Sequence, residues 1–174
     1  AGRDSNRVTA FDTGPGNMII DELVRTFSKG RVSFDRNGRM AARGRVDPDV
    51  LREWSRHPFL NALPPKSCGR EQFGRKFVAD SLERHRRRRI PPNDWIATAT
   101  MFTATSIASA CRNFLPQRAA VDELVLCGGG TKNPTLRAWL TAILGRTRVR
   151  TIDELGIRAS DKEALSFALL GCAR

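Results

Sequence analysis

The stretch from Trp95 to Cys111 constrains the fold most, because its 17 residues carry no charge in a chain with 30 lysines and arginines and 18 acidic residues. Its apolar residues keep helical spacing, which predicts a helix that is buried on most sides. It contains six serine and threonine residues and is shorter than the roughly 20 apolar residues of a membrane span. We therefore expect the central helix of a globular core and no membrane partner.

Strands and helices are predicted to alternate along the rest of the chain. The expected elements are a strand at Val8–Phe11, a helix between Asn17 and Gly30, a loop or hairpin over 30–45, a helix that starts at Asp47 and ends before Pro58, an extended stretch at 63–66, a helix from Arg70 to about Arg88, the uncharged helix, a strand at Leu124–Cys127, a helix from Asn133 to near Gly145, a strand at Arg148–Ile152 and a last helix from Ser160. This alternation is typical of an α/β layer with parallel strands. Only three or four strands are expected, so the sheet is predicted to be incomplete and the chain a piece of a larger protein.

The first candidate site is the turn Asp12–Asn17, which follows the first predicted strand. Gly14 and Gly16 lack a Cβ, so the backbone can come close to a ligand. Asn17 is a candidate N-cap of a helix whose free N–H groups suit phosphate. Asp12 lies at the carboxyl end of the strand, where a carboxylate can act as general base or contact a metal ion. An ordinary glycine turn capped by Asp12 explains the same residues.

The second candidate site is Gly128-Gly129-Gly130, which follows the predicted strand and precedes Asn133-Pro134 at a helix start. A glycine turn between a strand and a helix suits a nucleotide, because no side chain blocks a base or ribose. No Gly-Lys-Ser/Thr follows, so this turn is not a Walker A loop. A tight strand–helix connection is the alternative, but two glycine turns in one small chain are more specific than either alone.

Two charged segments have both a functional and a structural interpretation. Lys66–Glu71 combines cation, hydroxyl, glycine, guanidinium and carboxylate at a helix start, which suits an anionic ligand or a pinned loop. Arg84–Arg89 has five arginines in six residues, which suits a phosphate backbone or a solvated helix end. No aromatic residue interleaves with these arginines, so nucleic-acid binding centred on them is kept only as the alternative function.

The four cysteines form no CxxC pair and the sequence has no metal-ligand cluster, so we expect no zinc ribbon, no dithiol redox motif and no protein metal site. Free thiols in a reducing compartment are the simpler interpretation. No signal-peptide pattern opens the chain, and we expect a cytoplasmic protein.

An ordered set of motifs covers nearly the whole chain. The motifs are Ala10-Phe-Asp-Thr-Gly-Pro-Gly-Asn-Met18, Ala42-Arg-Gly-Arg-Val-Asp47, His57-Pro-Phe59, Pro64-Pro-Lys-Ser-Cys-Gly-Arg-Glu71, Leu126-Cys-Gly-Gly-Gly130 with Asn133-Pro134, Asp153-Glu-Leu-Gly-Ile157 and Lys162-Glu-Ala-Leu-Ser-Phe-Ala168. Together they resemble the C-terminal half of anhydro-N-acetylmuramic acid kinases, and the ordered set is far more specific than any single motif.

The resemblance implies the actin, Hsp70 and sugar kinase fold, with this chain as one incomplete RNase H-like lobe that carries a mostly helical insertion at 31–92. It implies that the N-terminal lobe is absent from this chain, and that ATP and Mg²⁺ bind in the cleft between the lobes. Family members convert 1,6-anhydro-N-acetylmuramic acid, ATP and water to N-acetylmuramic acid 6-phosphate and ADP, in peptidoglycan recycling. A homodimer is a further possibility that the resemblance leaves open.

The resemblance also implies roles for single residues. Asp12 would activate the water that opens the anhydro ring, while the sugar O6 accepts the γ-phosphoryl group. The nucleotide would contact Gly14, Gly16 and Asn17 at its phosphates, and Gly128, Gly129, Gly130 and Asn133 at its adenosine end. Glu163 would face the sugar, although a capping box with Ser160 explains it equally well.

The chain departs from the family pattern at two points. Cys68 stands where the pattern has Thr, and nothing in the sequence matches the first phosphate loop of the N-terminal lobe. We therefore expect that the 174 residues alone neither bind ATP tightly nor turn over. A degraded lobe that survives as an interaction module is the remaining alternative.

Overall fold

The computed structural model describes residues 9–115, 121–158, 161, 164 and 167–168. The predicted capping box of Ser160 and Glu163 lies outside the described residues. The α-helices are α1 (Met18–Phe27), α2 (Arg39–Arg43), α3 (Pro48–Trp54), α4 (Pro58–Asn61), α5 (Arg70–Phe73), α6 (Arg75–Arg84), α7 (Pro92–Phe114) and α8 (Pro134–Leu144). Strands β1 (Glu123–Leu126) and β2 (Arg148–Thr151) and the 3₁₀ turns η2 (Arg36–Gly38), η3 (Arg86–Arg88), η4 (Gly129–Lys132) and η5 (Ile152–Leu155) complete this part.

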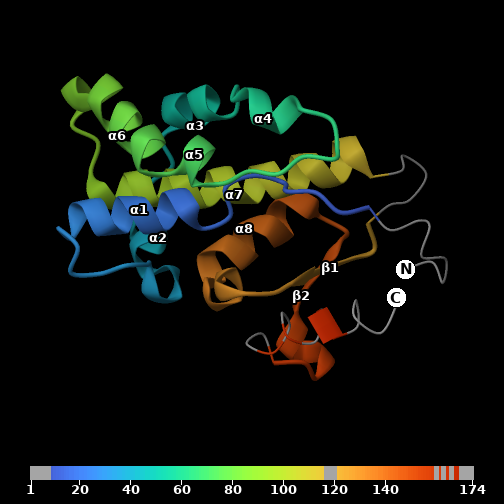
Figure 1. Ribbon diagram of the computed structural model, residues 1–174. Helices are drawn as coiled ribbons and strands as arrows, with labels where there is room; N and C mark the ends of the chain where they lie inside the picture. The colour runs from blue at the N-terminus through green and yellow to red at the C-terminus, as the bar shows by residue number, and fades with distance from the viewer. Residues whose placement is uncertain (1–8, 116–120, 159–160, 162–163, 165–166, 169–174) are drawn as a thin grey trace.

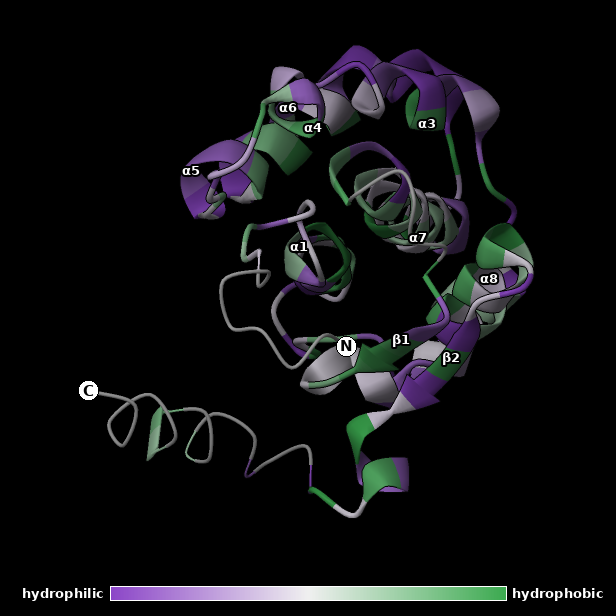
Figure 2. Ribbon diagram, turned by 90° about the vertical axis from the view of Figure 1, so that its right-hand side faces the viewer, coloured by the Kyte–Doolittle hydropathy of each residue, from purple (hydrophilic) through white to green (hydrophobic). Residues whose placement is uncertain are grey.

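Helix α7 is the centre of the molecule, as the uncharged stretch predicts. Helices α1, α2, α3 and α8 all contact it, and Figure 2 shows α1, α3 and α8 around its axis. Its buried hydroxyls are satisfied within the helix: Thr98 Oγ1 donates to Asp94 O at 2.7 Å, and Thr100 Oγ1 donates to Ile96 O at 2.8 Å. A polar residue can thus be buried here without losing a hydrogen bond. No helix of the described part is both long and apolar enough to cross a membrane.

One side of α7 is covered by the layer of short helices α3 to α6 (Figure 1). The core between them is aromatic: the Trp54 ring lies 5.6 Å from that of Phe102, and the indole N–H donates to Ser81 Oγ at 2.7 Å. Asp47 caps α3 as predicted, since its carboxylate accepts hydrogen bonds from Asp49 N and Val50 N. The predicted end of this helix before Pro58 is also confirmed.

On another side of α7, β1, α8 and β2 form a β–α–β unit. The strands pair in parallel from Glu123↔Arg148 to Leu126↔Thr151, which confirms the predicted parallel layer. Leu136 and Leu140 of α8 are buried in a second, smaller core between the sheet and α7. The α/β class is confirmed, although the described chain is mostly helical.

The sheet is smaller than predicted. It has two strands in the described part, and residues 9–13 form no strand, so the strand expected at Val8–Phe11 is wrong over its described residues. Asp12 N donates to Lys66 O at 2.9 Å, which is a single bond to a loop rather than a ladder. An apolar, β-prone sequence becomes a strand only where a second strand lies beside it.

Two further expectations are wrong in detail. The helix predicted from Arg70 to about Arg88 is divided into α5, α6 and η3, with Gly74 (φ −92°, ψ −150°) at the first break. A Cβ on Gly74 would collide with the Arg70 carbonyl, so the break needs glycine. Residues 30–45 form η2 and α2 instead of a hairpin, because both oxygens of the buried Asp35 carboxylate cap α2.

Candidate functional site

Asn17 brings together the two glycine turns that the sequence indicates. A Cβ built on Gly129 would stand 3.6 Å from Asn17 Nδ2, and one built on Gly130 would stand 3.7 Å from Asn17 Oδ1. Asn17 is the N-cap residue of α1, as predicted, but its side chain makes no capping hydrogen bond to this helix. Its amide lies against the second glycine turn, which places the start of α1 beside η4.

A pocket of ≈ 750 Å³ adjoins this contact, between α1, the segment 33–37 and η4. This volume is in the range of sites that bind small molecules. Asn17, Gly129 and Asn133 are in its wall, and the other lining residues include the cations Arg25, Arg36 and Lys132, the half-exposed ring of Phe34, and Asp21. Amide, cationic and aromatic groups together suit a ligand with an anionic end and a planar end.

Among the described residues, two carboxylates line this pocket, those of Asp21 and Asp35. Asp35 caps α2, so Asp21 is the one that makes no capping interaction with that helix. Burial raises its pKa above the ordinary value, and the nearby Arg25 and Arg70 offset this only in part. Phe34, Arg36 and Lys132 were not singled out in the sequence. No spacing rule links Phe34 to Lys132, since only the packing of η2 on η4 and α8 brings them to one pocket.

The two glycines of the turn after Asp12 are needed for different reasons. Gly16 has φ +54° with open space where a Cβ would point, so glycine is needed there for the backbone conformation. A Cβ on Gly14 would stand 2.6 Å from Ser106 Oγ of α7, so Gly14 is needed for packing. The side of Gly14 where a Cβ would project is thus filled by α7, not by a ligand.

Gly128 to Asn133 form the second turn. Gly128 has φ +77° and faces open space, and its carbonyl accepts a hydrogen bond from Thr131 Oγ1 at 2.8 Å. Asn133 caps α8 as predicted, with its Oδ1 accepting from Leu136 N at 3.0 Å. The cap uses the side-chain carbonyl oxygen of Asn133, so a ligand would meet the side-chain NH₂ group of this residue.

The side chain of Asp12 is held by the segment Lys66–Glu71, for which the sequence allows both a functional and a structural interpretation. Its Oδ2 accepts hydrogen bonds from Ser67 Oγ and from Cys68 N, both at 2.9 Å. Asp12 lines a different pocket, of ≈ 610 Å³, together with Phe11, Lys66 and Ser67. The structure therefore brings Asn17, Gly129, Gly130 and Asn133 together, and leaves Asp12 at the other end of its turn.

Cys68 completes the contact between this segment and the turn. Its Sγ donates to Gly14 O at 3.1 Å. Burial, helped by the nearby Asp12 and Glu71 and opposed by Lys66, raises the pKa of the Cys68 thiol to about 11. At neutral pH the sulfur is thus a protonated hydrogen-bond donor and not a nucleophile.

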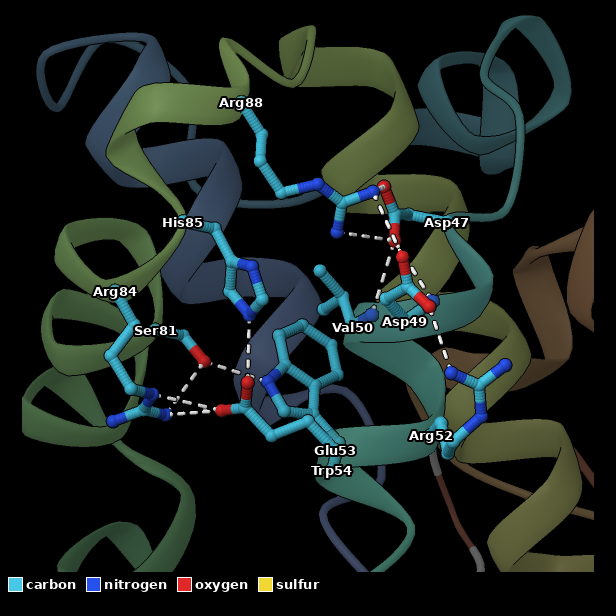
Figure 3. A network of polar contacts seen from close by, with 10 residues as sticks. All are labelled: Asp47, Asp49, Val50, Arg52, Glu53, Trp54, Ser81, Arg84, His85 and Arg88. Carbon is cyan, nitrogen blue, oxygen red and sulfur yellow. Dashed lines mark hydrogen bonds and ion pairs between the residues drawn. The ribbon is translucent and has the colours of Figure 1, made fainter.

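Part of the arginine-rich segment is engaged in ion pairs with α3 and its N-cap, as Figure 3 shows. Arg84 pairs with Glu53 at 2.6 Å, and Arg88 pairs with Asp47 at 2.8 Å. His85 Nε2 lies 2.7 Å from the second Glu53 oxygen, with its side chain only 14% exposed. Arg84 and Arg88 therefore hold α6 and η3 to α3, while Arg86, Arg87 and Arg89 are exposed and make no ion pair with α3 in the described structure.

Both acids of this network are stabilised in their ionised form. Burial alone would raise the pKa of Glu53, but hydrogen bonds from His85 and Arg84 lower it below the ordinary value. Burial likewise opposes ionisation of Asp47, and bonds from Val50 N and Arg88 outweigh it, so the pKa of Asp47 is also lowered. The charge pairs therefore contribute to folding, which is the structural interpretation of this segment.

Among the described residues no group of three or more His, Cys, Asp or Glu could hold a metal ion. Glu163, the residue expected to face the sugar, lies outside the described residues.

Comparison with known proteins shows which family these features belong to. The family described as anhydro-N-acetylmuramic acid kinase matches residues 3–174. The chain is 42% identical to the enzyme of that name from Acaryochloris marina, over 94% of this chain and 42% of the relative. It is 43% identical to the one from Bacillus cereus, over 97% of this chain and 44% of the relative. It thus spans well under half the length of these curated relatives. The chain belongs to the anhydro-N-acetylmuramic acid kinase family.

Proposed function

We propose that this chain is the C-terminal lobe of a kinase that converts 1,6-anhydro-N-acetylmuramic acid, ATP and water to N-acetylmuramic acid 6-phosphate and ADP. The observation that carries this proposal is the proximity of Asn17 to Gly129 and Gly130, since it brings the two glycine turns together beside one pocket. Family membership supplies the substrate class.

In this proposal the nucleotide occupies the pocket of ≈ 750 Å³. Its adenosine end lies against Gly128–Gly130 and the NH₂ end of Asn133, with the Phe34 ring available for stacking. Its phosphates extend toward Asn17 and Gly16, where Arg25, Arg36 and Lys132 of the pocket wall favour negative charge. Gly14 supports the turn from behind through its packing on α7, a structural role in place of direct phosphate contact.

The residues present fit Mg²⁺ delivered with ATP. This ion retains several waters and binds chiefly to the phosphates with one or two carboxylates, so it needs no cage of protein ligands. Asp21 is the carboxylate of the pocket wall that could share it through water. When bound, the ion neutralises phosphate charge during transfer.

Asp12 acts as the general base in this proposal. Its carboxylate takes a proton from water, the water oxygen bonds to C1 of the sugar, and the C1–O6 bond breaks. O6 then bonds to the γ-phosphorus as ADP leaves. Asp12 and Asn17 lie at the two ends of one short turn, so the sugar and the phosphates would meet across it.

The whole enzyme is larger than this chain in our proposal. A second lobe, from polypeptide beyond these residues, would supply the other wall of the cleft, and residues 31–92 would be a helical insertion in an RNase H-like lobe. The chain alone would then have no turnover. A cytoplasmic location, where ATP is available, follows from the same proposal, and Glu163 as a sugar contact and a homodimer stay predictions.

The test is turnover of the complete kinase with ATP, Mg²⁺ and the anhydro sugar in ¹⁸O-labelled water. We expect ADP and a sugar 6-phosphate with ¹⁸O at the anomeric hydroxyl and none in the phosphate. Asp12→Asn should abolish turnover and leave nucleotide affinity nearly unchanged. ATP hydrolysis without sugar phosphate, or equal reaction of the ring-opened sugar, would contradict the proposal.

A further inference from the structure

The Asp12 carboxylate is fixed by a loop that lies far from it in sequence. Ser67 Oγ and Cys68 N donate to the same oxygen, Oδ2, each at 2.9 Å. The backbone of Asp12 is tied to the same loop, because its N–H donates to Lys66 O at 2.9 Å. Among the described residues no hydrogen bond reaches the other oxygen, Oδ1.

The loop is itself anchored by a half-buried cation. Lys66 Nζ donates to Phe59 O and Leu60 O, each at 3.1 Å, at the end of α4. The same ammonium lies 4.2 Å from the centre of the Phe114 ring at the end of α7. Burial lowers the pKa of Lys66, and the electrostatic interaction with the nearby Cys68 opposes this in part. Lys66 makes no ion pair with Asp12 in the described structure, so it acts on the carboxylate only through the loop.

We infer that Ser67 is a positioning residue for Asp12, and that Lys66 holds the loop from which it acts. This inference rests on the proposed function. With Oδ2 held from one side by a hydroxyl and an amide, rotation of the carboxylate is restricted and Oδ1 is presented to the reacting water. A base that is misplaced by about 1 Å can lose on the order of 10²-fold in rate, so such a restraint has catalytic value.

Ser67 can be substituted without disturbing the core. Its hydroxyl is exposed in this chain and contributes no apolar packing to the core, so removing it should not unfold the protein. Cys68 N is a backbone donor that no substitution other than proline removes. Ser67 is therefore the group through which this device can be tested.

The experiment compares variants of the complete kinase by steady-state kinetics. Ser67→Ala should lower kcat by about 10- to 100-fold, because Asp12 loses one of its two restraints, with the KM values for ATP and sugar within about twofold of wild type. Ser67→Thr keeps a hydroxyl at the same position and should recover most of the lost kcat. Ser55→Ala is the matched control, since the Ser55 hydroxyl is also exposed and donates only to Leu51 O, within α3.

Three outcomes separate the inference from the proposed function. An inactive wild-type enzyme would overturn both. An active wild type with unchanged kcat in Ser67→Ala would overturn the positioning role alone. A loss of kcat that Ser67→Thr does not recover, or one that is accompanied by an equal rise in KM or a fall in Tm, would show a structural role instead and would also overturn it.

Discussion

The Asn17 side chain faces Gly130, and a Cβ built on this glycine would stand 3.7 Å from Asn17 Oδ1. This contact joins the start of α1 to η4, although a large part of the chain separates the two in sequence. A distance of this size is ordinary van der Waals contact, so alanine can replace the glycine without a clash.

Gly129→Ala and Gly130→Ala are therefore predicted to separate ligand binding from folding. The added methyl groups find ordinary contacts with Asn17, so Tm should stay within a few degrees of wild type. A nucleotide that approaches this backbone would be displaced, and we expect its affinity to fall by about tenfold, or about 1.4 kcal/mol. Calorimetric titration of the complete kinase with ADP measures this. Unchanged affinity in both variants would remove η4 from the nucleotide site.

Gly14→Ala is predicted to act in the opposite way, on stability. Its Cβ would stand 2.6 Å from Ser106 Oγ and 2.9 Å from Ser106 Cβ in the buried face of α7. Overpacking of this kind costs about 1–3 kcal/mol. Urea unfolding of the chain should show that loss, and Ser106→Gly in the same protein should recover part of it. If the two substitutions are simply additive, the steric explanation fails.

The ion pairs around Glu53 predict an acid-sensitive contribution to stability. Because the pKa of Glu53 is lowered in the folded state, this contribution is present above the unfolded-state pKa and is lost as the pH falls through the folded-state pKa. Glu53→Gln should thus lower the stability at pH 7 by about 0.2–1 kcal/mol, the range of partly exposed pairs, and change it little at pH 3.

Glu83→Gln is the matched control, since Glu83 is more exposed and pairs with Arg86 at 3.5 Å. We expect it to change the thermal unfolding temperature little at either pH. A difference between Glu53→Gln and wild type that persists undiminished at pH 3 would show that the ionised pair is not its source.

The thiols are predicted to differ in their reactivity toward iodoacetamide at pH 8. Of the three thiols in the described part of the chain, that of Cys127 is exposed and should be alkylated first. Burial raises the pKa of Cys68 to about 11 and also raises that of Cys111, so both should react slowly in the folded chain and quickly in urea. Trypsin leaves each in a separate peptide, and mass spectrometry can follow them individually. Equal rates for Cys68 and Cys127 in the folded chain would contradict the buried position of Cys68.

Much of the architecture follows from local sequence. The uncharged run inside α7 predicts the central helix, because a helix with no charged face is stable only when it is covered. Asp47 and Asn133 predict the starts of α3 and α8, since a cap depends on the few residues beside it. The parallel pairing of β1 and β2 follows from the helix between them, because a short turn cannot join parallel strands.

Only part of the candidate site can be predicted from the sequence. Local residue types predict two separate turns, one with Asn17 and one with the glycines of η4, because a turn depends on the few residues that form it. That they share a wall with Phe34 and Arg36 depends on how η2 packs against η4 and α8, which no local pattern encodes. Gly14 shows the converse. A glycine in this turn suggests a ligand site, and only the position of Ser106 reveals that glycine is needed there for packing.

The amino-acid sequence alone is thus sufficient to predict the elements whose hydrogen bonds and buried faces are local: α7, the capped helices and the turns. Which side chains meet across those elements depends on how the elements pack. Ser67 reaches Asp12, Glu53 pairs with Arg84, and residues 9–13 find a loop instead of a strand. Each of these depends on contacts between distant parts of the chain, whose energies exist only once the helices have packed around α7.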